Sequence, residues 1–184
     1  KRIVLGSSSA QRKKILRENL GISDFEVSKS DCEENIDKAS CATVEEYVER
    51  TCRGKFDDIV QNKIAGDEPD LLLCADTVIA IKEDDGKEKE TILEKASDRA
   101  HAISMLKMMS GRKHRVVTAV LFRMKGQDVL GFTDSTEVQF NELPEKAIDA
   151  YVDSGEAYGK AGAYGIQSLG ASFVRKIDGC YYNV

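Results

Sequence analysis

The segment LGSSSAQRKKIL, residues 5–16, predicts a strand that turns through small residues directly into a helix. The apolar run 3–5 supplies the strand, and a glycine followed by three serines supplies the turn. Ser9 is a good helix N-cap, because its hydroxyl can accept a hydrogen bond from an otherwise unpaired backbone N–H. Arg12 and Lys13 lie in the following turn, so this segment could bind an anion such as phosphate. An ordinary capped helix with solvated basic side chains is the alternative interpretation.

The composition is typical of a globular protein with one hydrophobic core. The 184 residues are 41% hydrophobic and 32% charged, which suits one full core or at most two lobes that share it. A formal net charge of −5 argues against a general nucleic-acid binder, although it permits a locally basic cleft for a small anionic substrate. No apolar run approaches the length of a membrane span, and the first residues lack the pattern of a signal peptide. We therefore expect a protein that binds neither nucleic acid nor membrane.

The cysteines favour a reducing compartment. They are odd in number, scattered, and form no C-x-x-C pair, so reduced thiols in the cytoplasm are the simplest interpretation. The chain has only two histidines, which makes a zinc site unexpected. The five cysteines are Cys32, Cys41, Cys52, Cys74 and Cys180.

Hydrophobic periodicity and turn residues predict the element order β-α-β-α-β-β-α-β-β-α-loop-β. The first helix is expected over residues 9–20, with Leu20 on its buried face. A second helix, over roughly residues 43–64, begins with the capping box Thr-x-x-Glu. Ser97 is expected to cap a third helix. This order predicts an α/β domain with a mixed sheet covered by helices, in two lobes that flank a cleft.

Asp76 is the strongest local signal of a functional site. It stands between the apolar runs 71–75 and 78–81, in a segment typical of a buried strand. Burying an unpaired carboxylate is costly, so Asp76 should meet a cation, hydrogen-bond donors or the floor of a cleft. A structural aspartate bonded to neighbouring backbone is the alternative.

Two other segments could carry function. The acidic stretch 30–35 is typical of a solvated loop, and its functional version is Glu33 or Glu34 reaching a divalent cation. The segment 155–170 holds five of the fourteen glycines and must form a shaped loop, of a kind that often carries function. For His114, we expect a structural hydrogen bond rather than a role in catalysis.

The chain resembles the Maf family of nucleoside triphosphate pyrophosphatases over nearly its whole length. The most specific matches are KAGAYGIQ at 160–167 and ADT at 75–77. Ser-x-x-Arg-Lys-x-x-Leu at 9–16, SGR-x-H at 110–114 and IDG-x-Y-x-NV at 177–184 also match. The resemblance implies a Maf/ITPase-like α/β fold, in which a twisted mixed sheet flanked by helices forms two lobes around a central nucleotide-binding cleft. Residues 1–184 would form a single Maf-like domain that lacks the family's C-terminal helix.

The resemblance also implies an activity. Members hydrolyse a nucleoside triphosphate to the monophosphate and pyrophosphate, with a divalent metal cation that is usually Mg²⁺ and otherwise Mn²⁺. The Asp-Thr pair and the Gly-Ile-Gln segment are typical of the branch that favours dTTP, UTP and some modified pyrimidine nucleotides and cleans the nucleotide pool. Dimers are common in the family. A weakly active or inactive nucleotide-binding protein linked to cell-division control is the alternative, and a protein-interaction module is a third hypothesis.

The residues that match family positions receive roles by resemblance. Asp76 matches the proton acceptor, which we expect to orient or deprotonate the attacking water and, with Glu34, to hold the metal. Lys55 and Lys95 complete the catalytic set and would stabilise charge on the departing pyrophosphate. The side chains expected to bind the substrate phosphates are those of Ser7, Ser9, Arg12, Lys13 and Lys160. Thr77 and Gln167 offer groups suited to the edge of a uracil or thymine base.

Three positions depart from the family pattern. Gln11 replaces an arginine tied to substrate choice, which leaves the preferred base open. Ala96 replaces a proline and makes the loop after Lys95 less rigid. Gly159 stands beside Lys160 where the family has an aspartate, which predicts weaker turnover or metal affinity and favours the nucleotide-binding alternative.

Overall fold

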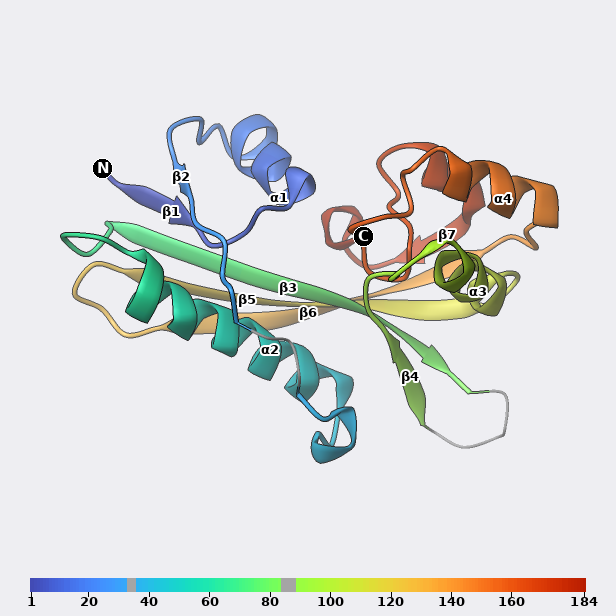
Figure 1. Cartoon of the computed structure of the whole chain (residues 1–184), viewed down its shortest axis with the longest axis horizontal. Coiled ribbons are helices and arrows are strands. Elements are labelled where there is room, and N and C mark those ends of the chain that lie inside the picture. The colour runs from blue at the N-terminus through green and yellow to red at the C-terminus, as the bar shows by residue number, and fades with distance from the viewer. Residues whose placement is uncertain (33–35, 84–88) are drawn as a thin grey trace. The chain divides into compact units, whose positions relative to one another are not determined.

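A computed structural model of the chain describes residues 1–32, 36–83 and 89–184, and the predicted order of elements is confirmed (Figure 1). The helices and strands are β1 (Ile3–Leu5), α1 (Ala10–Lys14), β2 (Glu26–Val27), α2 (Val44–Asp58), β3 (Leu71–Lys82), β4 (Glu90–Leu93), α3 (Arg99–Met109), β5 (Lys113–Met124), β6 (Leu130–Phe140), α4 (Glu145–Asp153) and β7 (Val174–Asp178). Two π-helical turns, Ile15–Asn19 and Ile59–Lys63, extend α1 and α2. No helix in the described part of the chain is long and apolar enough to cross a membrane.

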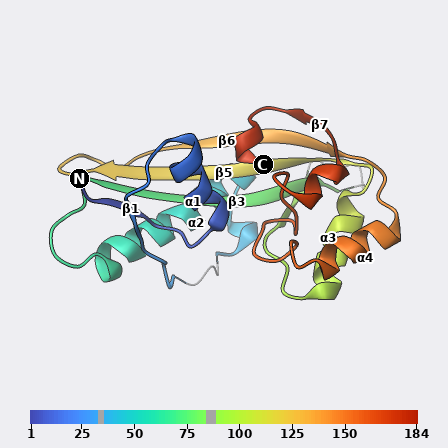
Figure 2. The same ribbon diagram turned by 90° about the horizontal axis from the view of Figure 1, so that it is seen from above.

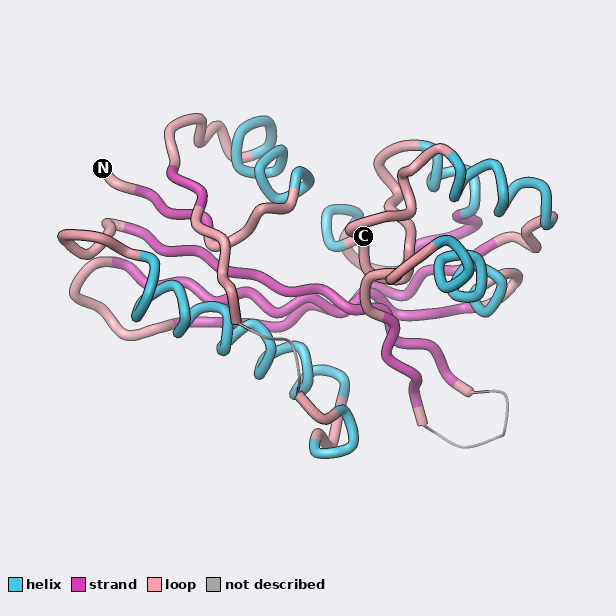
Figure 3. Tube along the Cα trace, in the orientation of Figure 1, coloured by secondary structure: helices cyan, strands magenta, loops and turns pink. Residues whose placement is uncertain are grey.

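The strands form a mixed sheet, which confirms the expected α/β class (Figure 3). The strand order within the described residues is β2-β1-β3-β5-β6-β7, and β4 pairs with β3. β1 runs parallel to both β2 and β3, whereas β4 is antiparallel to β3 and β7 is antiparallel to β6. The chain divides into two compact units, Lys1–Asp76 with Thr118–Thr133 and Thr77–Val117 with Asp134–Val184.

In the first unit, α2 packs its apolar face inward. The predicted stripe on this helix is buried at every position. Thr43 caps the helix by accepting a hydrogen bond from Glu46 N at 3.1 Å, as the capping box predicts. The buried stripe consists of Val44, Tyr47, Val48, Thr51 and Cys52. This packing sets α2 alongside β3, as Figures 1 and 2 both show.

Two local predictions are wrong. Leu20 is 61% exposed rather than buried. The helix ends in a π-helical turn, in which Leu20 N donates to Ile15 O at 3.1 Å. Because a π-turn holds more residues than an α-turn, the side chains that follow it point in different directions from those of an α-helix. Asp98, not Ser97, caps α3: its carboxylate accepts a hydrogen bond from His101 N at 2.8 Å, and the Ser97 hydroxyl donates to Asp98 instead. An ionised carboxylate is the stronger acceptor for a backbone N–H.

In the second unit, α3 and α4 pack against each other and cover a core that contains a cluster of five rings. Arg99 of α3 joins the two helices through bonds of 2.8 Å to Asp149 and Asp153 of α4. The ring cluster consists of His114, Phe140, Tyr151, Tyr164 and Phe173, with neighbouring centroids 4.7–5.8 Å apart.

His114 makes the structural hydrogen bond expected of it. Its Nε2 lies 2.7 Å from the Tyr164 hydroxyl, deep in the ring cluster. His114 is 2% exposed, and no described group bonds its Nδ1. Burial lowers the pKa of His114 to about 4, so the ring is neutral at physiological pH.

Candidate active site

The centre of the candidate site is an ion pair between α2 and β3 of the first unit. Lys55 Nζ donates a hydrogen bond to Asp76 Oδ1 at 2.7 Å. The two side chains are only 14% and 9% exposed. Asp76 therefore meets a cation, as the sequence predicts, whereas the ordinary expectation that a mid-helix lysine points into solvent is wrong for Lys55. A buried charge pair of this kind is weak evidence of stability and is consistent with a functional role.

Two buried thiols of the first unit, Cys52 and Cys74, respond to the charges of this site. Burial raises the pKa of Cys52 to about 11; the Asp76 charge adds to that rise, and the charges of Arg12 and Lys55 oppose it. Burial raises the pKa of Cys74 to about 12, and the positive charges of Arg12 and Lys55 oppose this rise as well. Arg12 and Lys55 therefore act on both thiols, and Asp76 acts on Cys52. Both thiols stay protonated and inert at neutral pH.

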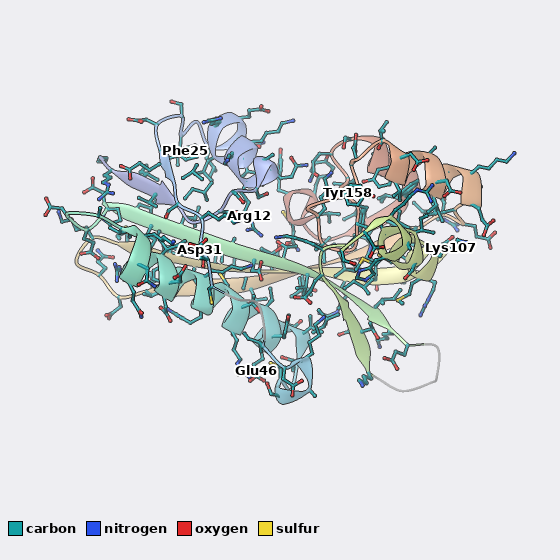
Figure 4. All side chains as sticks on the ribbon, in the orientation of Figure 1. Arg12, Phe25, Asp31, Glu46, Lys107 and Tyr158 are labelled. Atoms are coloured by element: carbon teal, nitrogen blue, oxygen red, sulfur yellow. The ribbon has the colours of Figure 1, made fainter. Side chains whose placement is uncertain are left out.

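The turn between β1 and α1 is held as predicted. Ser9 caps α1 by accepting from Arg12 N at 3.4 Å, and Ser7 Oγ accepts from Arg12 Nη1 at 3.1 Å. Gly6 lets this turn approach β3 and the end of α2, because a Cβ at its position would overlap Cys74 Sγ of β3 and lie 2.6 Å from Ile59 Cδ1. Ser7 and Arg12 are thus brought together, while Lys13 lies half-buried on the same helical turn. Figure 4 labels Arg12 at the first helix.

The start of the acidic stretch is anchored to the end of α2 by Asp58. Its Oδ2 accepts from the Ser30 hydroxyl at 2.7 Å and from Asp31 N at 2.9 Å, and its Oδ1 accepts from Asn62 at 2.9 Å. Bonds from the side chains of Asn62 and Ser30 and the backbone of Asp31 lower the pKa of Asp58 to about 2. Glu34, the predicted second metal ligand, lies outside the described residues.

Replacing Asp58 by Ala should loosen this anchor. We expect amide exchange at Asp31 to quicken about tenfold at pH 6, since its bonded carboxylate is lost. In the native protein, the anchor should persist above about pH 4 and fail as the pH falls toward 2, because the folded pKa is depressed. Hydrogen exchange measured by NMR tests this. Asp57→Ala, at an exposed neighbouring position, is the control, and equal exchange in both variants would contradict the assignment.

In the second unit, the glycine-rich loop lies against the segment that carries Lys95. Lys95 and Ala161 form an antiparallel bridge, and Gly162 N donates to Glu94 O at 2.9 Å. Gly162 has φ +62°, and a Cβ there would lie 2.5 Å from Ile79 Cγ1 of β3. Thr77 is on the same face of β3 as Ile79, because side chains alternate along a strand. The loop therefore packs on the face of β3 that carries Thr77.

Lys160 and Gln167 are brought together by that loop. A Cβ on Gly165 would lie 3.0 Å from Lys160 Cδ and 3.3 Å from Gln167 Oε1, so both side chains contact one backbone position. Glu156 bonds to two positions within the loop: its carbonyl accepts from the Lys160 ammonium, and its carboxylate accepts from the Ser168 hydroxyl. The sequence interpretation does not assign this role to Glu156, because the spacing of charges within a glycine-rich loop does not reveal how the loop folds back.

A family model described as "Maf-like protein" matches residues 2–184. This chain belongs to the Maf family. Its sequence-based identification is confirmed.

The similarity to relatives of this Maf-family chain extends over all or nearly all of its residues. It is 39% identical over 185 residues to a dTTP/UTP pyrophosphatase of Clostridium perfringens strain SM101, covering 100% of this chain and 89% of that protein. It is 40% identical over 182 residues to a dTTP/UTP pyrophosphatase of Thermococcus gammatolerans, covering 99% and 88%. A solved HAM1 protein from Coxiella burnetii has 15% identity, a TM-score of 0.43, and coverage of 78% and 74%, a likeness too weak to add to the family assignment.

The departures from the Maf pattern differ in burial: Gly159 is exposed, whereas Gln11 and Ala96 are half-buried. Gly159 is exposed with φ +76°, and no heavy atom lies within 4 Å of the place that a Cβ would occupy. There is space for a side chain at this position, but the positive φ is a backbone conformation that favours glycine. Gln11 is half-buried on α1, beside Arg12.

Proposed function

We propose that this chain is a nucleoside triphosphate pyrophosphatase that hydrolyses dTTP, UTP or modified pyrimidine nucleotides to the monophosphate and pyrophosphate. The relatives that match the whole chain are named for dTTP and UTP. The structural observation that carries the proposal is the buried pair of Lys55 and Asp76, 2.7 Å apart. The five free thiols suit a cytoplasmic enzyme.

Asp76 is suited to handling the attacking water. An ionised carboxylate only accepts hydrogen bonds, so it can orient a water molecule and take its proton. The Lys55 ammonium fixes one carboxylate oxygen, Oδ1, and so limits the orientations of the group. Lys55 also places a positive charge beside a phosphate that gains negative charge on the way to products.

Asp76 also fits a divalent cation, which we propose to be Mg²⁺ or Mn²⁺. The described residues contain no group of three or more side chains of the types that bind metals, so they do not form a complete protein cage. Mg²⁺ instead commonly uses one or two carboxylates together with substrate phosphates and waters, and the second oxygen of Asp76 suits that mode, with Glu34 as the proposed partner. A bound cation would supply positive charge to the triphosphate.

The remaining predicted residues divide between phosphate and base recognition. In the first unit, we assign phosphate binding to Ser7, Ser9, Arg12 and Lys13. In the second unit, we assign phosphate binding to Lys160, transition-state charge stabilisation to Lys95, and base recognition to Thr77 and Gln167. Arginine suits bidentate contact with phosphate oxygens, whereas lysines act as movable point charges.

A pyrophosphate-release panel tests the proposal. The substrates are UTP, dTTP, CTP, ATP, GTP and a modified pyrimidine triphosphate, each with Mg²⁺, with Mn²⁺ and with EDTA. We expect release from UTP and dTTP at least tenfold above the purine nucleotides, and no release in EDTA. Metal-dependent release from another base would refute the substrate assignment and keep the chemistry. Binding of UTP without any release would refute the enzyme and support the nucleotide-binding alternative.

A further inference from the structure

Glu156 lies where the glycine-rich loop leaves α4, and its backbone is tied to that helix. Ser154 follows the last residue of α4, and its hydroxyl donates to Tyr151 O at 2.6 Å and accepts from Glu156 N at 3.3 Å. A residue fixed to a helix end is held more precisely than one on a free loop. Glu156 is therefore a firm starting point for the loop that follows it.

The Glu156 carboxylate closes the loop. It accepts a hydrogen bond from the Ser168 hydroxyl, 12 residues further along the chain. Ser168 precedes the 3-10 turn Leu169–Phe173, whose last residue is buried in the core of the second unit. A hydrogen bond to an ionised carboxylate is stronger than one between neutral groups. The carboxylate thus joins two anchored points of the second unit, one at each end of the enclosed segment.

The enclosed segment carries two of the proposed substrate contacts, Lys160 and Gln167. Their side chains converge on Gly165, since a Cβ there would lie 3.0 Å from Lys160 Cδ and 3.3 Å from Gln167 Oε1. The carbonyl of Glu156 accepts from the Lys160 ammonium, and Gln167 directly precedes Ser168. Glu156 therefore bonds to one of the proposed contacts and to the chain neighbour of the other.

A role in folding alone is a poor explanation for the bond between Glu156 and Ser168. Glu156 is half-buried and Ser168 is exposed. Polar contacts at the surface contribute little to the free energy of unfolding. The core of the second unit is held instead by its ring cluster and by the packing of α3 on α4. The main effect of the bond is therefore local, on the shape of the loop.

We propose that Glu156 is a positioning residue for substrate binding: its carboxylate, bonded to Ser168, closes the loop and so holds Lys160 and Gln167 in place for the nucleotide. This inference rests on the proposed function, which assigns those two side chains to the substrate. The bond is already formed in the unliganded protein, so it lowers the cost of ordering the loop when substrate binds. Its loss should weaken binding more than turnover.

Glu156→Ala and Ser168→Ala test the proposal. Each removes one partner of the bond, so we expect either variant to raise KM for UTP and dTTP about fivefold while kcat stays within about twofold. The double variant should bind no more weakly than the single variants, because the same bond is lost only once. Glu156→Gln should bind within about twofold of the native protein, since the amide oxygen can still accept from the Ser168 hydroxyl.

Thermal unfolding separates positioning from a merely structural role. The melting temperatures of the unliganded variants should stay within about 2 °C of the native value, because the bond lies at the surface. Glu145→Ala and Ser172→Ala are the matched controls, and neither should change KM. The Glu145 side chain is 78% exposed at the opposite end of α4. The Ser172 hydroxyl donates to Leu169 O at 2.8 Å, outside the enclosed segment.

Three results would overturn the positioning role. The first is an unchanged KM in Glu156→Ala, or a fall in its melting temperature that accompanies the weaker binding. The second is an additive loss in the double variant, which would show that the two side chains act separately. The third is binding by Glu156→Gln as weak as that of Glu156→Ala, since the charge rather than the bond would then carry the effect.

Binding of α,β-imido-UTP with Mg²⁺ separates this inference from the proposed function. This analogue cannot be cleaved between its α- and β-phosphates, so its dissociation constant does not depend on turnover. If the native protein releases no pyrophosphate, the proposed enzyme activity fails, and this constant replaces KM. A ratio of about five between Glu156→Ala and the native protein then supports the inference. A ratio near one, or no binding by the native protein, overturns it.

Discussion

Replacing Asp76 by Asn should lower kcat for UTP hydrolysis by about 10²- to 10⁴-fold, because an amide cannot take the proton of the attacking water. The shape of the side chain is kept, and the Asn oxygen can still accept the hydrogen bond that Lys55 donates at 2.7 Å. We therefore expect a folded protein whose melting temperature falls, because the buried Lys55 ammonium keeps its hydrogen bond but loses its counter-charge. Steady-state pyrophosphate release and thermal unfolding, measured on the same preparations, test the two parts of this expectation.

Lys55→Met should fail in a different way. It leaves a carboxylate that is 9% exposed without its cation, so we expect a loss of about 3 kcal/mol in the free energy of unfolding as well as a large loss of kcat. In the double variant with Asp76→Asn, the uncompensated charge is gone. Most of the stability should then return, while activity should not.

Lys107→Met is the matched control for this pair of variants. Lys107 bonds Glu145 at 2.5 Å, but its side chain is 50% exposed (Figure 4), so its removal should leave activity unchanged and stability nearly so. Native-like activity in Asp76→Asn would contradict the assigned role of the carboxylate. Stability in the double variant no better than in Lys55→Met would show that the two charges do not act as a pair.

The second large effect that we expect is a loss of folding stability when His114 becomes protonated at low pH. Burial lowers the folded pKa to about 4 from about 6.5, so between these pH values the unfolded chain binds a proton that the folded protein does not. The stabilising contribution is complete above about pH 6.5 and falls as the pH drops toward 4, by about 3 kcal/mol over that window. The cause is burial in the ring cluster, where His114 is 2% exposed and contacts the rings of Phe140 and Tyr164 and the Tyr164 hydroxyl.

Urea unfolding of the native protein and of His114→Gln at pH 7, 6, 5 and 4 tests this. Gln can still bond the Tyr164 hydroxyl but does not titrate, so its disadvantage relative to the native protein should shrink by about 3 kcal/mol from pH 7 to pH 4. The other histidine of the chain, His101, is exposed on α3, and His101→Gln should unfold in parallel with the native protein. Parallel curves for His114→Gln as well would refute the neutral, buried imidazole.

The order of elements could be predicted because it depends on patterns that repeat over a few residues. The stripe on α2, the cap at Ser9 and the hairpin of β5 and β6 are all local, and the structure confirms them. Such local patterns did not correctly predict the exposure of Leu20 or the residue that caps α3. A π-helical turn and the competition between two adjacent capping residues depend on small energy differences that spacing alone does not express.

The candidate site was predictable where burial of a charge gives a signal and unpredictable where it depends on tertiary placement. Asp76 stands out because its neighbours along the chain are apolar. Lys55 gives no such signal, since a lysine in a helix is ordinarily solvated, and only the packing of α2 brings it to the carboxylate.

The connectivity of the two units has a consequence for how such a chain can evolve. The chain passes from one unit to the other three times, and each passage falls inside a strand, within β3, β5 and β6. No single cut in the gene can therefore release either unit intact, and neither can be duplicated or exchanged as a cassette. Variation in this protein has to arise by substitution within both units together, or by extensions at the chain ends and surface loops.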